Sequence, residues 1–124
     1  MNDISLHHVS LLVGDTERAL AFWHDLLGLA LDPARPDLGY PGAWLQAGHG
    51  LQIHLLELSD PCAGRERPEH GGRDAHVALR VGDFDGLRRR LEAAGFRPSL
   101  SRSGRRAMFV RDADGNAVEL IAAD

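Results

Sequence analysis

The sequence predicts an α+β protein that contains two copies of a strand-helix-strand-strand-strand unit. The first observation is an internal repeat: residues 8–15 and 76–83 share six of eight residues, namely His, Val, Leu, Val, Gly and Asp. The second is that each copy continues into apolar residues at helical spacing and then into alternating segments typical of strands. The chain has 124 residues, enough for one domain with its own hydrophobic core.

Composition excludes several classes of protein. The formal net charge is −4, which argues against general nucleic-acid binding, because that binding needs an excess of cations. All 14 cationic side chains are arginines, so no lysine is available for a Schiff base. Cys62 is the only cysteine, which excludes an intrachain disulfide or a cysteine metal cluster. The N-terminus lacks a secretory signal pattern and no apolar run has the length of a membrane span, so we expect a cytoplasmic protein without membrane partners.

The first copy begins with an alternating strand over residues 5–13. The side chains of Val9, Leu11 and Val13 can face a covering helix. Those of His8, Ser10 and Leu12 then lie on the opposite face of the sheet. Asp15 is a suitable N-cap for a helix that runs through Leu27, and Gly28 is a natural left-handed residue at its end.

Three strands should complete the first copy, which we place at residues 4–58. The pattern predicts a short strand at 29–32, a Pro- and Gly-rich turn region at 32–42, a strand at 43–47, a hairpin turn at 48–50 and a strand at 51–58. In the last of these strands, alternation places Gln52, His54 and Leu56 on one face.

A polar linker over residues 59–73 should separate the copies, because the segment has almost no apolar residues. The second copy, residues 74–122, then repeats the order. We predict a strand at 75–81, a helix from its N-cap Asp83 to Gly95, strands at 97–100 and 106–111, a turn at 112–115 and a strand at 116–122.

The repeat groups four side chains of the kinds that bind metals. His8 is equivalent to His76, and the alignment that matches Trp44 with Phe109 also matches His54 with Glu119. If the copies pair about a pseudo-twofold axis, these residues form two symmetry-related pairs. Three imidazoles and a carboxylate suit Zn²⁺, Ni²⁺, Co²⁺, Fe²⁺ or Mn²⁺, and the sequence does not rank these ions.

Such a site would leave coordination positions for water or substrate oxygens, and Glu119 could also act as a general base. Any one of these residues alone is more often a hydrogen-bonded or solvated side chain than a ligand. His7 should lie on the opposite strand face from His8 and have a structural role. Solvent exposure is expected for His24, His49 and His70. The cluster Arg102, Arg105 and Arg106 could clamp an anion, although a solvated loop is the simpler interpretation.

Residues 8–15, 22–29 and 112–120 resemble the vicinal oxygen chelate superfamily, which includes glyoxalase I, bleomycin-resistance proteins, fosfomycin-resistance thiol transferases, methylmalonyl-CoA epimerases and extradiol dioxygenases. The resemblance covers nearly all of residues 1–124, which we take as one domain. It implies two βαβββ modules whose mixed sheets form a cup around a metal. It implies a homodimer with sites at the interface. His8, His76 and Glu119 match positions that commonly hold ligands, and His54 matches the position of a second glutamate in glyoxalase I.

The resemblance therefore implies a divalent-metal enzyme of the glyoxalase I-like type, with lyase or isomerase chemistry on a small oxygenated substrate and a possible thiol co-substrate. Candidate substrate contacts are Ser10, Trp44, Phe109 and Arg106. Three alternatives stay open. A fosfomycin-type thiol transferase would use Ser10 but has Phe109 where an aromatic hydroxyl is usual. An extradiol dioxygenase would use His8, His76 and Glu119 as a triad that His54 would crowd. A drug-binding protein would need no catalysis.

Overall fold

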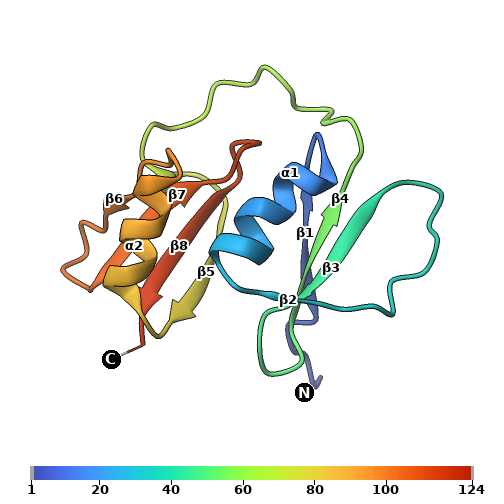
Figure 1. Ribbon diagram of the computed structural model, residues 1–124, viewed down its shortest axis with the longest axis horizontal. Helices are drawn as coiled ribbons and strands as arrows, with labels where there is room; N and C mark the ends of the chain where they lie inside the picture. The colour runs from blue at the N-terminus through green and yellow to red at the C-terminus, as the bar shows by residue number, and fades with distance from the viewer. Residues whose placement is uncertain (1, 124) are drawn as a thin grey trace. The chain divides into compact units, whose positions relative to one another are not determined.

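The computed structural model describes residues 2–123 and contains two compact units, one ending at Asp60 and the other beginning at Pro61. Each unit has a four-stranded mixed sheet and the element order that the repeat predicts (Figure 1). The predicted α+β fold is confirmed. Within the described residues, no helix is long and apolar enough to cross a membrane.

Unit 1 contains β1 (His8–Leu12), α1 (Thr16–Leu20), the π-helical segment η1 (Ala21–Leu26), β2 (Ala30–Leu31), β3 (Gly42–Gln46) and β4 (Gln52–Leu56). The sheet order is β1-β4-β3-β2, with β1 parallel to β4 and the other pairs antiparallel. Ala43, Leu45, Ile53 and Leu55 are buried on one face of this sheet. The register places His8, Trp44 and His54 on the other face, because alternate residues of a strand point to opposite sides.

The first helix begins as predicted but does not continue as an α-helix. The Asp15 carboxylate accepts a hydrogen bond from the Arg18 backbone N–H at 2.9 Å, which confirms the N-cap. From Ala21 the turns widen, and the Leu27 N–H donates to the carbonyl of Phe22, five residues earlier. The widened segment carries two adjacent large aromatic side chains, Phe22 and Trp23, and buries both of them.

Unit 2 repeats this topology with β5 (His76–Val81), α2 (Phe84–Ala93), β6 (Ser99–Leu100), β7 (Ala107–Arg111) and β8 (Ala117–Ala122). The sheet order is β5-β8-β7-β6, and β5 is parallel to β8. Leu87 and Leu91 are the buried aliphatic residues of α2, which contacts β8. Asp83 caps this helix by accepting from the Gly86 N–H at 3.0 Å, as the sequence predicts.

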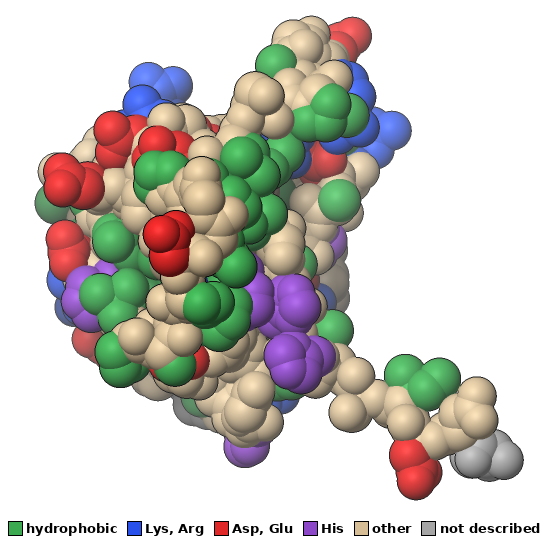
Figure 2. All heavy atoms as spheres, turned by 90° about the vertical axis from the view of Figure 1, so that its right-hand side faces the viewer, with side chains coloured by type: hydrophobic (Ala, Val, Ile, Leu, Met, Phe, Trp, Pro, Cys, Tyr) green, Lys and Arg blue, Asp and Glu red, His purple; other side chains and the backbone are tan. Residues whose placement is uncertain are grey.

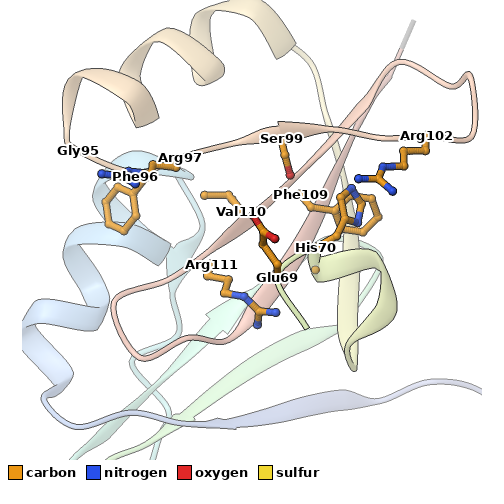
Figure 3. A pocket seen from close by; sticks show the side chains of 11 residues that line it. Glu69, His70, Gly95, Phe96, Arg97, Ser99, Arg102, Phe109, Val110 and Arg111 are labelled. Atoms are coloured by element: carbon orange, nitrogen blue, oxygen red, sulfur yellow. The ribbon is translucent and has the colours of Figure 1, made fainter. Parts of the chain in front are cut away.

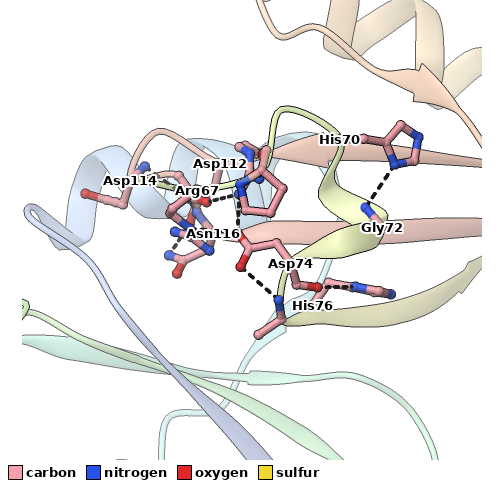
Figure 4. A network of polar contacts seen from close by, with 12 residues as sticks. Arg67, His70, Gly72, Asp74, His76, Asp112, Asp114 and Asn116 are labelled. Carbon is pink, nitrogen blue, oxygen red and sulfur yellow. Dashed lines mark hydrogen bonds and ion pairs between the residues drawn. The ribbon is translucent and has the colours of Figure 1, made fainter. Parts of the chain in front are cut away.

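The turn between β7 and β8 is built around a buried carboxylate. Asp112 Oδ1 accepts from the N–H groups of Asp114 and Asn116 at 2.9 and 2.8 Å, and Gly115 has the positive φ of 85° that favours glycine (Figure 4). This turn fixes the register between the two strands. That register pairs Phe109 with Glu119 and so places the predicted ligand on a defined face of the sheet.

The second half of the predicted linker is structured. A short 3₁₀ helix, η2 (Gly71–Arg73), contacts β7 and β8, and a Cβ at Gly71 would lie only 3.3 Å from Ala117 Cβ. Asp74, next to η2, accepts from Arg67 Nε at 2.7 Å and from Arg111 Nη1 at 2.8 Å (Figure 4). The segment therefore belongs to unit 2, held by a glycine contact and arginine bonds instead of apolar side chains.

Asp74 should make the stability of unit 2 sensitive to acid. The hydrogen bond from Arg111, supported by Arg67, lowers the pKa of Asp74 from 3.8 to about 2. Because the folded state holds this proton less tightly than the unfolded state, the stabilisation is complete above pH 3.8 and is lost as the pH falls towards 2. We expect Asp74→Asn to lower the free energy of unfolding at pH 7 by about 1–3 kcal/mol, since two guanidinium groups lose an anionic partner.

The measurement is urea unfolding at pH 7 and pH 3, followed by circular dichroism because both tryptophans, Trp23 and Trp44, lie in unit 1. Glu92→Gln is the matched control, since its ion pair with Arg88 is exposed and should be worth little. Equal losses in the two variants at pH 7, or an Asp74→Asn variant that keeps the full acid sensitivity, would contradict this account.

Candidate functional site

The four predicted metal ligands lie as two pairs, one in each unit. In unit 2, His76 Nε2 lies 3.5 Å from Glu119 Oε1. The other ring nitrogen, His76 Nδ1, lies 2.8 Å from the Asp74 carbonyl oxygen and must donate to it. Because Nδ1 carries the proton, Nε2 has a free lone pair that points towards Glu119. Metal-binding histidines are commonly held in this way, with one ring nitrogen donating to a carbonyl and the other binding the ion.

Glu119 is a buried carboxylate with two different partners. Its side chain is 5% exposed, and its second oxygen, Oε2, accepts from Arg105 Nη2 at 2.8 Å. Arg105 is 58% exposed and comes from the loop before β7, where its Nε–H and backbone N–H both lie 3.3 Å from Ser103 Oγ. An exposed arginine on a loop thus compensates the buried charge, which would otherwise be costly to bury.

The pair in unit 1 is a stack of rings. His54 lies between Trp44 and His8, with ring centroids 4.5 and 4.1 Å away and interplanar angles of 10° and 16°. His54 Nε2 lies 2.8 Å from Gln52 Oε1, and Gln52 Nε2 donates in turn to Asp32 Oδ2 at 2.7 Å. This chain of bonds assigns the proton of neutral His54 to Nε2 and leaves the lone pair on Nδ1.

His7 contacts His8, contrary to the expectation that the two residues face opposite sides of a strand. β1 begins only at His8, so His7 is not bound by strand alternation, and its Nδ1 lies 2.8 Å from His8 Nδ1. Histidine side chains gather on the surface beside the N-terminal segment (Figure 2). The ring of His7 meets that of His8, which in turn stacks on the buried His54. The His7 contact occupies His8 Nδ1 and leaves Nε2 as the nitrogen able to bind a ligand.

Comparison with known proteins assigns the family. Residues 5–120 match the model of the Glyoxalase/Bleomycin resistance protein/Dioxygenase superfamily. The chain belongs to this superfamily. It is 34% identical to a glutathione transferase FosA from Serratia marcescens, over 94% of this chain and 79% of that protein, and 30% identical to a lactoylglutathione lyase from Haemophilus influenzae, over 92% and 89%. The expected resemblance is confirmed.

A solved superfamily structure has the same fold. A variant of the fosfomycin resistance protein FosX from Listeria monocytogenes, solved with Mn(II) and a dihydroxypropylphosphonic acid, superposes with a TM-score of 0.75 at 20% identity. The alignment covers 97% of this chain and 92% of that one. Superfamily members therefore include a protein that binds a divalent metal together with a small oxygenated molecule.

The donor chemistry of unit 2 fits the kind of ion that superfamily members bind. Two ligand atoms bonded to one ion at about 2.1 Å lie roughly 3.0–3.4 Å apart, close to the 3.5 Å between His76 Nε2 and Glu119 Oε1. The stack in unit 1 fits less well, because an ion bonds in the plane of an imidazole and the planes of His8 and His54 are nearly parallel. In neither unit do the described residues bring three His, Cys, Asp or Glu side chains together for a metal.

The predicted substrate contacts lie in different places. Ser10 pairs with His54 in the sheet and is exposed, and Trp44 stacks on His54. Phe109 is buried and meets the His76 ring edge-on, with centroids 5.2 Å apart. Arg106 lies over the Phe84 ring and pairs with Asp85, so its guanidinium is directed to α2.

Two histidines expected to be solvated have defined contacts. His24 Nδ1 lies 2.7 Å from the Leu29 carbonyl oxygen, which gives it a role at the end of the first helix. The ring of His70, in the predicted linker, packs at 4.9 Å from Phe109. A possible signal for His70 was the pair Gly71-Gly72 after it, which permits close approach to a sheet.

His54 should be harder to protonate than an ordinary histidine, because its pKa is lowered. Burial, then the nearby His8 and His7, lowers the pKa of His54 below 6.5, and Asp32 opposes this shift only in part. Between the lowered pKa and 6.5 the unfolded state binds more protons, so the folded state loses stability as the pH falls through that window.

Histidine ring NMR on metal-free protein in chelator measures this directly. We expect His54 to titrate below 6.5 as the Nε2–H tautomer, and His7→Ala to raise its pKa by removing a neighbouring charge. His49→Ala, in the turn before β4, should leave it unchanged. A His54 pKa at or above 6.5 would contradict the account.

Proposed function

We propose that this chain is a divalent-metal-dependent enzyme of the glyoxalase I-like type, which acts on a small oxygenated substrate. The observation that carries the proposal is the pair in unit 2, where a histidine nitrogen with its lone pair free and a buried carboxylate oxygen lie 3.5 Å apart. Membership of the superfamily supports it, as does the lactoylglutathione lyase at 30% identity.

The proposed ligands are His76 Nε2 and Glu119 Oε1, with His8 Nε2 contributed by unit 1 of the same chain or of a partner in a homodimer. His54, the fourth predicted ligand, would have to leave its stack to reach an ion held by His8. We therefore propose that His54 supports the His8 ring from one side while His7 holds it from the other. The native ion would be Zn²⁺, Ni²⁺, Co²⁺, Fe²⁺ or Mn²⁺.

When bound, such an ion supplies a Lewis acid for a carbonyl or alkoxide oxygen of the substrate. The residues of this chain would provide orientation and proton transfer. Glu119 is the only carboxylate within this pair, so it would serve both as ligand and as candidate base. Its Oε2 is free to take a proton only when Arg105 moves away, because that oxygen accepts the Arg105 hydrogen bond. Phe109 would exclude water from one side of His76.

A thiol transferase is the second candidate. Two observations favour it: the chain is 34% identical to a glutathione transferase FosA, and the His8–His54 stack leaves a set of two histidines and one carboxylate. Addition of a thiol to an epoxide needs less proton transfer on carbon than an isomerisation does. A site with a single carboxylate base therefore suits the addition better than the isomerisation. Both candidates would use a small-molecule substrate and a thiol.

Metal-loaded protein can separate the candidates. Conversion of methylglyoxal and glutathione to a thioester supports the first, and loss of free thiol with fosfomycin supports the second. Oxygen uptake with a catechol under Fe²⁺ would instead indicate a dioxygenase. Binding of metal with none of these reactions would favour a broader substrate search, whereas absence of metal binding would contradict both candidates.

Metal content tests the ligand assignment. We expect purified protein without a His-tag to bind one equivalent of divalent ion per site, and His8→Ala, His76→Ala and Glu119→Ala each to lose it. His54→Ala should retain most of the metal, because its ring is stacked on His8. Elemental analysis after dialysis provides the readout. Loss of metal in His54→Ala equal to that in His76→Ala would restore His54 as a ligand.

Arg105 should weaken metal binding by neutralising Glu119. Arg105→Gln removes that cation, so we expect the dissociation constant for the metal to fall by about three- to tenfold while the metal-free protein becomes slightly less stable. Arg106→Gln makes the same charge change one residue away, where the guanidinium pairs with Asp85. Isothermal titration would contradict the account if Arg105→Gln weakened binding or if both variants behaved alike.

A further inference from the structure

A chain of hydrogen bonds connects the outer edge of the unit 1 sheet to the ring stack. Asp32 follows β2, the edge strand of the order β1-β4-β3-β2, and its backbone N–H donates to the Trp44 carbonyl at 2.8 Å. Gln52 and His54 lie two residues apart on one face of β4. Asp32 Oδ2 accepts from Gln52 Nε2 at 2.7 Å, and Gln52 Oε1 lies 2.8 Å from His54 Nε2. The chain therefore ends on the ring that stacks against His8.

The Asp32 carboxylate gives this chain a single direction. Its Oδ1 accepts from the Ala34 backbone N–H at 2.9 Å, so both oxygens serve as acceptors. An ionised carboxylate has no proton to donate, so the Gln52 amide must turn its NH₂ towards Asp32 and its carbonyl towards His54. That carbonyl in turn needs a proton on His54 Nε2. Each member thus has one orientation, and His54 is held as the Nε2–H tautomer.

Ring contacts hold the same histidine from both sides. His54 is 8% exposed and lies between Trp44 and His8, whose ring centroids are 4.5 and 4.1 Å away. The bond to Gln52 acts close to the plane of the ring, while the stacking contacts act above and below it. A change of rotamer at His54 would therefore break the hydrogen bond and both ring contacts.

Unit 2 has an alanine where unit 1 has Gln52. The parallel registers establish this equivalence, because Gln52 pairs with His8 and Ala117 pairs with His76. A methyl group neither donates nor accepts a hydrogen bond, so the side chain of Ala117 cannot hold Glu119, two residues further along β8. Glu119 Oε1 instead faces His76 Nε2 at 3.5 Å.

The aromatic residues of the two sheets differ in the same sense. Trp44 covers one side of the His54 ring, with an interplanar angle of 10°. Phe109, its counterpart in unit 2, meets a histidine ring edge-on and lines a cavity of about 630 Å³ (Figure 3). The bracing of His54 is thus a property of unit 1, built from residues that differ from their counterparts in unit 2.

Held in this way, His54 cannot share an ion with His8. A metal bonds in the plane of an imidazole, and the two ring planes are 16° apart with their centroids separated by 4.1 Å. An ion in the plane of His8 therefore lies outside the plane of His54. His54 Nε2 also carries the proton that Gln52 accepts, which excludes that nitrogen as a ligand. His54 would bind the ion only after it left both Gln52 and the stack.

We propose that Asp32 and Gln52 are positioning residues that keep His54 out of the coordination sphere of the metal. The inference rests on the proposed function, in which unit 1 supplies His8 to the ion. By withholding His54, the chain leaves one more coordination position open to substrate than a four-ligand set would. The number of ligands from unit 1 is then determined by two residues that do not contact the ion.

Asp32→Asn tests the direction of the chain in metal-free protein. The Ala34 N–H still needs an acceptor, so the new carboxamide should keep its oxygen there and present its NH₂ to Gln52. The Gln52 amide must then turn over, and His54 Nε2 becomes an acceptor. At pH 8, above the lowered pKa of His54, ring NMR should show the Nε2–H tautomer in the wild type and the Nδ1–H tautomer in Asp32→Asn.

Gln52→Ala tests whether the chain withholds the ligand. It gives unit 1 the residue that unit 2 has at the equivalent position, and it removes the in-plane bond to His54. We expect a mixture of His54 tautomers, and a dissociation constant for Co²⁺ that falls by about three- to tenfold as His54 joins the ligands. Paramagnetic NMR of the Co²⁺-loaded variant should show one more bound histidine ring than the wild type. Gln46→Ala is the matched control, because this exposed glutamine pairs with Gln52 on β3.

Asp37→Asn is the control for Asp32→Asn, because its carboxylate accepts from the Gly39 N–H in the same loop. It removes the same charge and should leave the His54 tautomer unchanged. The inference is overturned if Asp32→Asn keeps the Nε2–H tautomer, or if Gln52→Ala binds Co²⁺ no more tightly than Gln46→Ala. These failures leave Co²⁺ binding by the wild type intact, whereas failure of the proposed function abolishes it.

Discussion

The buried carboxylate of Glu119 is the constraint on which unit 2 depends. A charge in this position must be compensated, and the chain does so with Arg105, which donates to Oε2, while Oε1 faces the His76 ring. Arg105 is an exposed loop residue, so under the proposed function a metal ion would take its place without disturbing the core. Under the proposed function, this carboxylate is compensated in the metal-free protein and would then be available to a metal.

The elements around Glu119 determine where it points. The Asp112 turn fixes the register of β7 and β8, and that register aligns Glu119 with Phe109. Asp74 serves twice: its carboxylate binds Arg67 and Arg111, and its carbonyl orients the ring of His76. Substitutions at Asp112 or Asp74 would therefore alter the site indirectly, although neither residue is a proposed ligand.

The repeat in the sequence predicted the topology because strand alternation, the caps at Asp15 and Asp83 and the glycine turns are local properties. It also predicted that His8 and His76 occupy equivalent strands, and they do. The ring stack of Trp44, His54 and His8 could not be predicted, because side-chain torsions are not encoded in spacing. His7 was misplaced because strand alternation was applied to a residue that precedes β1. His70 was missed because its partner, Phe109, is distant in sequence.

The two units share a sheet topology but differ in the side chains around their histidines. In unit 1, Trp44 stacks on His54, whereas in unit 2 the equivalent Phe109 meets the rings of His76 and His70 and lines a cavity. Unit 1 thus offers ring surface and the imidazole nitrogens of a stack, whereas unit 2 offers a histidine nitrogen beside a buried carboxylate.

The most direct test of the central claim is an anomalous-scattering crystal structure of the protein loaded with Co²⁺ or Mn²⁺. The account predicts an ion bonded to His76 Nε2, Glu119 Oε1 and His8 Nε2, with His54 still stacked on His8. An ion bonded to His7 and His8 without Glu119, or one that takes His54 as a ligand, would contradict it.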